Sequence, residues 1–167
     1  MHTTDAIRIA LTLSYEWNRM LAEDLRSAPL AFPTSNGGNH ATWVVGHAAT
    51  SQAGLRSFIT GEPSPRASWE ATLGGGTTPV ADASAYPSYE TLMDAWKAEY
   101  EKTLALLAEQ TDASLDARPK ALPESLKDHP SFRSVGHVLM FIAMHEMSHR
   151  AQLADVRRAL GRGVLAF

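Results

Sequence analysis

The chain has 167 residues, of which 44% are hydrophobic and 20% charged, and this composition is typical of a single soluble domain spanning residues 1–167. The net charge of -3 and the lack of any run of Lys or Arg exclude the basic surface of nucleic-acid-binding proteins. Because the chain has no cysteine, disulfides, thiolate metal sites and cysteine nucleophiles are excluded, and any metal must be bound by His, Asp or Glu.

The first residues, MHTTDAIRIALTLSYEWNRM, lack the basic segment and continuous apolar core of a secretory signal. Apolar runs elsewhere fall short of the roughly 20 residues that a membrane-spanning helix needs. We therefore expect a cytoplasmic protein that binds neither membrane nor nucleic acid.

Apolar residues recur at helical spacing in four segments, and no segment shows convincing strand alternation. The first predicted helix follows three candidate N-cap residues at positions 3 to 5 and ends before Pro29. The second begins near Asn39 and ends at Thr60, where Gly61 gives a stop signal.

Residues 62 to 88 contain PSP, GGG, TTP and YP, which predict a long irregular connection. A structureless connection of this length is uncommon inside a compact domain. Either a crossover between helices or a lid over a site would account for it. The third helix is predicted from about Ser88 to Gln110 or slightly beyond, and the last from near Ser131 to Leu160. The pattern indicates an all-α fold, a four-helix bundle with a long crossover between its second and third helices.

Three histidines lie at core-facing positions of two predicted helices. His145 and His149, in the segment HEMSH, fall in the apolar stripe of the last helix, and His47 falls in that of the second. Residues four apart lie one turn apart with Cβ atoms roughly 6 Å from each other, so that both imidazoles can converge on one cation. A lone core histidine is usually only hydrogen-bonded, but three are costly to bury unless they share a partner. The pattern therefore predicts a metal site.

HEMSH also spells HExxH, the zinc-protease signature, in which the glutamate activates water. A protease needs a third ligand, and no glutamate follows Glu146. Asp155 stands where one protease class has that ligand, but the apolar periodicity continues past it. An unbroken helix carries Asp155 about 9 Å along the axis from His149 and away from the metal. The helical context therefore disfavours a protease.

The segments NHATWVVGHAATS and HEMSHRAQL together resemble the DinB/YfiT-like superfamily. The combination of GH on the second helix with HxxxHRxQ on the last is fairly specific, whereas neither part is so alone. The resemblance covers nearly the whole chain, including the helix lengths and the long connection. Ala151 replaces the glycine that the family often has, which is a mild change on a helix.

The resemblance implies an up-down-down-up four-helix bundle, commonly a homodimer, in which His47, His145 and His149 bind a divalent ion, zinc or nickel. Characterised relatives are largely transferases or isomerases that use low-molecular-weight thiols. The resemblance thus implies an S-transferase acting on a small electrophile with an external thiol as co-substrate, and a chain without cysteine fits this. A non-catalytic metal-binding bundle, acting as a dimer or through a protein partner, and a metal-dependent hydrolase remain alternatives.

Two weaker candidates lie near the predicted ligands along their helices. His40 lies about two turns before His47, and it is expected to support the site, contact substrate or cap the helix rather than bind the metal. Gln152 lies on the stripe one turn beyond His149, from where it can orient a ligand or a histidine of the site.

The other two weak candidates lie off the apolar stripe. Glu146 is about 100° round from His145, which favours a solvated or interhelical residue over a catalytic base. Arg150 can contact an anionic substrate, although an arginine beside a core stripe is more often an interface or surface residue.

Overall fold

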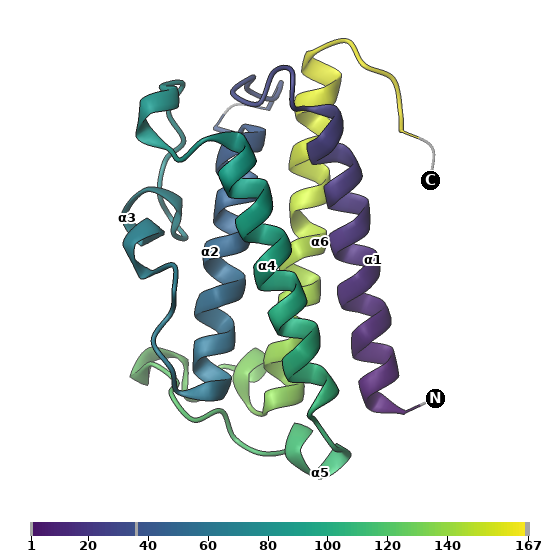
Figure 1. The fold of residues 1–167 in the computed structure, drawn as a ribbon, viewed down its shortest axis with the longest axis vertical. Coiled ribbons are helices and arrows are strands. Elements are labelled where there is room, and N and C mark those ends of the chain that lie inside the picture. Colours follow the sequence, from purple (N-terminus) through teal and green to yellow (C-terminus); the bar gives the residue numbers. More distant parts are fainter. Residues whose placement is uncertain (1, 36, 166–167) are drawn as a thin grey trace.

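The computed structural model describes residues 2–35 and 37–165, and the regular elements in this part of the chain are all helical. Four long helices lie side by side (Figure 1): α1 (Thr3–Asp24), α2 (Ala41–Thr60), α4 (Tyr89–Ala108) and α6 (Val135–Ala159). Followed along the chain, α1 and α6 run upward in this view, whereas α2 and α4 run downward. The all-α prediction is confirmed for the described residues.

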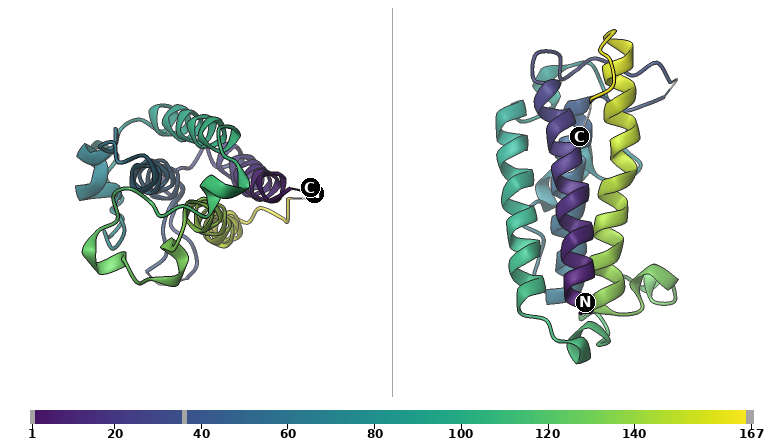
Figure 2. Two further views of the ribbon diagram at one scale, coloured as in Figure 1. Left: turned by 90° about the horizontal axis from the view of Figure 1, so that it is seen from below. Right: turned by 90° about the vertical axis from the view of Figure 1, so that its right-hand side faces the viewer.

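The four long helices surround a common core, as the end-on view shows (Figure 2). α1 packs mainly against α6, and α2 packs against both α4 and α6. Three aromatic rings meet in this core: Tyr15 stacks on Tyr100 at a centroid distance of 3.9 Å and meets the edge of Trp96 at 4.9 Å. Among the described residues, no helix combines the length and apolar character needed to cross a membrane.

Capping residues and terminating glycines in the local sequence account for most of the helix ends. α2 ends at Gly61, whose φ of 78° lies in the left-handed region that glycine adopts without strain. α4 begins after Ser88, whose hydroxyl accepts a hydrogen bond from the backbone of Thr91. The last helix begins slightly later than the predicted start near Ser131: Ser134 caps α6, and a short 3₁₀ helix precedes it. The N-cap of α1 is likewise His2 and not one of the three residues that follow it.

The connection between α2 and α4 is partly helical rather than irregular throughout. It contains α3 (Glu70–Leu73) and short 3₁₀ helices at Ala67–Trp69 and Ala83–Ala85. Glu99 of α4 anchors it: the Nε atom of Arg66 donates to the fully buried carboxylate at 3.1 Å, and Arg56 of α2 pairs with the same group. Two guanidinium groups compensate the burial of one charge. Arg66 fixes the connection to α4, and Arg56 joins α2 to α4.

The segment between α4 and α6 contains the remaining short elements. These are α5 (Asp112–Leu115) and two 3₁₀ helices, Glu124–Leu126 and Pro130–Phe132. α5 packs against α6, and the backbone N–H of Val135 donates to the carbonyl of Ala117 at 2.9 Å. This contact fixes where α6 enters the core, and so it sets the register of the histidines that follow.

Candidate metal centre

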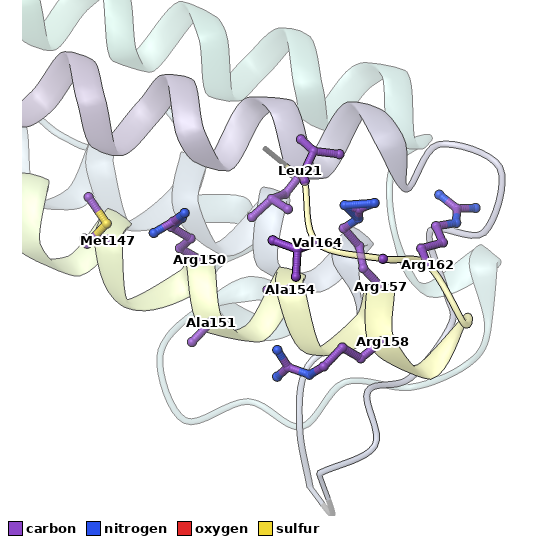
Figure 3. A pocket seen from close by; sticks show the side chains of 11 residues that line it. Leu21, Met147, Arg150, Ala151, Ala154, Arg157, Arg158, Arg162 and Val164 are labelled. Carbon is purple, nitrogen blue, oxygen red and sulfur yellow. The ribbon is translucent and has the colours of Figure 1, made fainter. Parts of the chain in front are cut away.

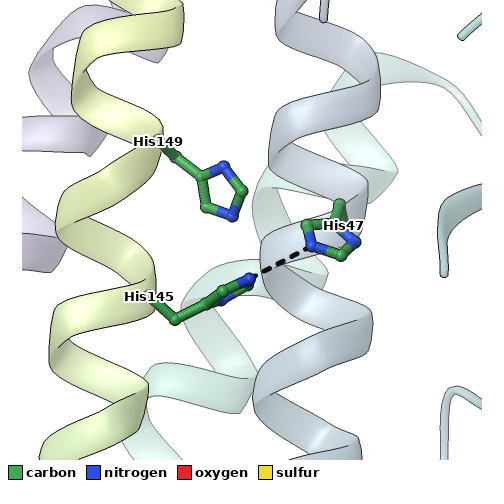
Figure 4. A group of neighbouring side chains, drawn as sticks. All are labelled: His47, His145 and His149. Atoms are coloured by element: carbon green, nitrogen blue, oxygen red, sulfur yellow. Dashed lines mark hydrogen bonds between the residues drawn. The ribbon is translucent and has the colours of Figure 1, made fainter. Parts of the chain in front are cut away.

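Three histidines from two neighbouring helices face one another in the interior (Figure 4). His47 comes from α2, and His145 and His149 come from successive turns of α6. One ring nitrogen of each lies within 4.8 Å of the other two, and the Nε2 atoms of His47 and His145 are 3.2 Å apart. His47 and His149 are buried, whereas His145 is partly exposed. The cluster can hold a divalent metal ion.

A backbone carbonyl from α3 fixes the ring of His47. Its Nδ1 atom lies 2.8 Å from the carbonyl oxygen of Leu73, and because a carbonyl can only accept, Nδ1 carries the proton. Leu73 approaches this closely because Gly46 has no side chain: a Cβ there would lie 2.7 Å from two carbons of Leu73. In a neutral His47, Nε2 is therefore unprotonated, and its lone pair is directed at the cluster.

A pair of amide side chains orients His149. The Oε1 atom of Gln152 lies 3.4 Å from Nδ1 of His149, and it accepts a hydrogen bond from the Nδ2 atom of Asn39 at 3.0 Å. Since an oxygen faces Nδ1, this nitrogen holds the proton and Nε2 is left to bind a metal. The structure thus places Gln152 where it can orient a histidine of the cluster.

The hydrogen bonding of the Nε2 atom of His149 indicates whether the cluster suits a metal ion. This atom is buried and has no hydrogen-bond partner among the described residues. A neutral His145 can donate from Nε2 to His47, but that bond leaves His149 unsatisfied. Nitrogen ligands around a tetrahedral zinc ion lie about 3.4 Å apart. The corresponding distance is 3.2 Å between His47 and His145, and all three nitrogens lie within 4.8 Å of one another. The donor set fits a small divalent cation better than hydrogen bonds among the rings.

Burial keeps the three imidazoles in the neutral form, which is the form that binds metals. Desolvation, with a smaller effect of the His47 charge, lowers the pKa of His145 to about 4. Desolvation followed by the charges of the other two histidines lowers the pKa of His149 to about 3. Desolvation also lowers the pKa of His47, although its bond to Leu73 opposes the shift. At neutral pH each imidazole of the cluster therefore has one unprotonated nitrogen, whose lone pair can bind a cation.

Aromatic and hydroxyl side chains border the cluster. Trp43 stacks on His47 with ring centroids 4.4 Å apart and planes 13° apart. Phe141 lies one turn before His145 with its ring nearly parallel, at a centroid distance of 6.0 Å. The hydroxyl of Ser51 lies 3.2 Å from Nε2 of His47. These neighbours restrict rotation of the two rings.

His40 lies outside the cluster and caps α2. Its Nδ1 atom accepts from the backbone N–H of Trp43 at 3.1 Å, and its Nε2 atom donates to the carbonyl of Val80 at 3.0 Å. The side chain is fully buried, and both ring nitrogens are used. His40 therefore cannot be a fourth ligand in this arrangement, and of the expected roles capping is the one observed.

Glu146 points away from the histidines into the core between the helices. Its Oε1 atom accepts from Gln52 of α2 at 3.0 Å and from Trp96 of α4 at 3.1 Å, and Asn18 of α1 donates to its backbone carbonyl. The solvated alternative was therefore wrong, and the interhelical one is observed. Desolvation raises the pKa of this carboxyl to about 7. Its contacts join all four long helices.

Arg150 and Asp155 also lie away from the cluster. The guanidinium of Arg150 lies over the ring of Trp17 in α1, 4.9 Å from its centroid. The carboxylate of Asp155 accepts from the hydroxyl of Thr34 at 2.7 Å and from the backbone of Ser35 at 3.1 Å. α6 continues unbroken past both positions. Asp155 is therefore held at the loop before α2 and not at the third-ligand position of a zinc protease.

Three contacts of the cluster were not found from the sequence. The carbonyl of Leu73 has no sequence signal, since any residue could supply it. Asn39 directly precedes the cap of α2, and a polar side chain at that place was the available hint. Phe141 shares the helical stripe of His145 at a spacing of four, which could have indicated their contact.

Comparison with known families identifies the fold family to which the sequence is similar. A family model described as the DinB superfamily matches residues 10–153, a range that includes the three histidines and the connection between α2 and α4. No curated protein matches the chain.

Proposed function

The chain belongs to the DinB superfamily, and from this premise and the three-histidine cluster we propose that it is a metal-dependent enzyme that transfers a low-molecular-weight thiol to a small electrophile. The observation that carries the proposal is the convergence of three neutral imidazoles. One of them, His149, has a buried nitrogen with no hydrogen-bond partner among the described residues. In this proposal His47, His145 and His149 bind zinc or nickel through one nitrogen each.

The chain's own residues prepare the site for such chemistry. Leu73 and Gln152 fix the proton on Nδ1 of His47 and His149, so that the opposite nitrogens can bind. A divalent cation bound there supplies Lewis acidity that lowers the pKa of a thiol or a water brought to it. Three protein ligands leave room for a substrate atom, and the partly exposed His145 marks the accessible side.

The thiol must come from outside, because the chain has no cysteine. In the transfer, a sulfur–carbon bond forms to the electrophile, the leaving group departs with its electron pair, and the thiol proton passes to solvent. Arg150 and Glu146 lie away from the cluster, so neither has a role in this step.

The proposal includes the fold type and the assembly. The helix directions and the extent of the family match support a single DinB-like four-helix bundle of the up-down-down-up type over residues 1–167. Exposed apolar side chains on the adjacent helices α1 and α6 (Ile9, Leu13 and Met144) support a homodimer. Sedimentation equilibrium tests this, and a monomer at micromolar concentration contradicts it.

Metal content tests the core of the proposal. Protein purified without an affinity tag or added metal is expected to carry zinc or nickel, and His145→Ala is expected to lose it. His137→Ala is the matched control, because His137 is an exposed histidine on the same helix. If the wild type neither contains nor takes up metal, the proposal fails.

Thiol consumption then tests the activity. The metal-loaded wild type is incubated with small thiols and electrophiles, with His145→Ala as the blank. Loss of thiol with formation of the adduct supports the transferase. Turnover of an ester without thiol would instead support the hydrolase, and a metal-loaded protein inactive in both assays would support the non-catalytic alternative.

A further inference from the structure

A cavity of about 370 Å³ lies between α1, α6 and the residues that follow α6 (Figure 3). Small-molecule sites typically have volumes of roughly 300–1,000 Å³. One part of its wall is apolar and comes from Leu21, Met147, Ala151, Ala154, Val164 and Leu165. The cavity is therefore large enough, and apolar enough, to take a short hydrocarbon chain.

The other part of the wall is positively charged. It consists of four arginines: Arg150, Arg157, Arg158 and Arg162. Arg157 and Arg162 share the carboxylate of Asp24, and Arg158 pairs with Asp155. Among Arg157, Arg158 and Arg162, two carboxylates against three guanidinium groups leave an excess of positive charge at the cavity, in a chain whose net charge is -3.

Arg157 has a donor group that the described residues do not satisfy. Its side chain is 8% exposed, and its Nε atom donates to Asp24 at 3.1 Å. Its Nη1 atom is buried and has no hydrogen-bond partner within residues 2–35 and 37–165. A buried guanidinium N–H without an acceptor costs free energy, and a carboxylate is the group whose geometry suits a guanidinium.

From these observations we infer that the cavity binds a small amphipathic anion, a carboxylate with an apolar body such as a medium-chain acid. The arginines take the carboxylate, and the apolar wall takes the chain. Ala154 follows His145 by about 900° of helical rotation, which is two full turns and a half turn. The cavity therefore lies on the opposite face of α6 from the proposed metal centre. Binding there does not require a metal at the histidines.

Titration calorimetry with octanoate, acetate and 1-octanol tests the two halves of the site. Octanoate is expected to bind saturably at a single site. Acetate lacks the apolar body and 1-octanol lacks the charge, so each is expected to bind at least about ten-fold more weakly, a difference of about 1.4 kcal/mol. Octanoate is also expected to bind His145→Ala with wild-type affinity, which separates this site from the proposed enzymatic one.

Variants of the wall show where octanoate binds. Ala154→Phe fills the cavity and is expected to abolish binding. Arg158→Gln removes one charge from a side chain that is 65% exposed, and it is expected to weaken binding several-fold. Arg133→Gln is the matched control, because Arg133 is an exposed arginine that precedes α6, outside this cavity. Thermal unfolding by circular dichroism verifies that each variant is folded.

Three outcomes would overturn the inference. Equal affinity for 1-octanol and octanoate would mean that the charge plays no part. Unchanged binding to a folded Ala154→Phe would place octanoate on another surface. A folded wild type that shows no saturable binding would mean that the cavity has no such ligand.

Discussion

The Nδ1 atom of His47 donates a hydrogen bond to the backbone carbonyl of Leu73 across 2.8 Å. This bond joins α2 to the short helix α3, and it decides which nitrogen of His47 faces the other two histidines. The connection between α2 and α4 therefore takes part in the candidate metal centre, although the three imidazoles come from α2 and α6.

Gly46→Ala is expected to weaken metal binding by about ten-fold or more, because the new methyl group displaces Leu73 and its carbonyl from His47. Overpacking is also expected to lower the free energy of unfolding by about 1–3 kcal/mol. Chelator competition measures the affinity, and urea unfolding measures the stability. Gly54→Ala is the matched control, since a Cβ there meets its nearest atom at an ordinary 3.8 Å. Equal affinity in the two variants would contradict the prediction.

Gln152→Leu is expected to weaken metal binding by about ten-fold, because His149 loses the acceptor that holds its Nδ1 proton. Gln152→Glu retains an oxygen at this place and is expected to restore most of the affinity. Chelator competition at neutral pH compares the three proteins. If the leucine variant binds as tightly as the wild type, Gln152 does not orient the site.

The metal-free protein is expected to lose stability as the pH falls below 6.5. The folded pKa values of His145 and His149, about 4 and 3, lie below the unfolded value of 6.5. Between these limits the unfolded chain binds more protons, so the free energy of unfolding falls by up to about 1.4 kcal/mol per pH unit for each histidine. Urea unfolding at several pH values, with a chelator present, gives the slope.

Replacing one buried histidine is expected to make that slope shallower. His149→Gln removes a buried imidazole that takes up a proton in this pH range only when the chain unfolds. His137→Gln changes an exposed histidine on the same helix and serves as the control. The same acid dependence in both variants would contradict the assignment.

Glu146→Gln is expected to stabilise the protein increasingly as the pH rises from 5 to 8. Desolvation raises the folded pKa of Glu146 to about 7 from 4.5. Between these values the unfolded chain has released a proton that the folded chain keeps, so the wild type loses stability as the pH rises toward 7. The difference from wild type is expected to reach on the order of 3 kcal/mol. Urea unfolding measures it, and Glu101→Gln is the control at an exposed position of α4. A difference that does not change with pH would refute the prediction.

The positions of the helices were largely predictable because their ends depend on local signals. Gly61 ends α2 and Ser88 caps α4, as the sequence indicated. The start of α6 was misplaced because two serines, at 131 and 134, are both acceptable caps, and the contact of Val135 with Ala117 selects the second. A contact between residues so far apart in sequence cannot be seen in a local pattern.

The sequence by itself determined that three histidines face the interior, because helical spacing puts each of them in an apolar stripe. Only the tertiary structure decided which ring nitrogens converge and which side chains fix them. It also directed Glu146 away from the cluster, and it used one nitrogen of His40 in a helix cap and the other in a bond to Val80. In the described part of the chain it left Nη1 of Arg157 without a hydrogen-bond partner. These features depend on how α2, α6 and the connection between α2 and α4 pack, and packing between distant segments is not encoded in the periodicity of any one of them.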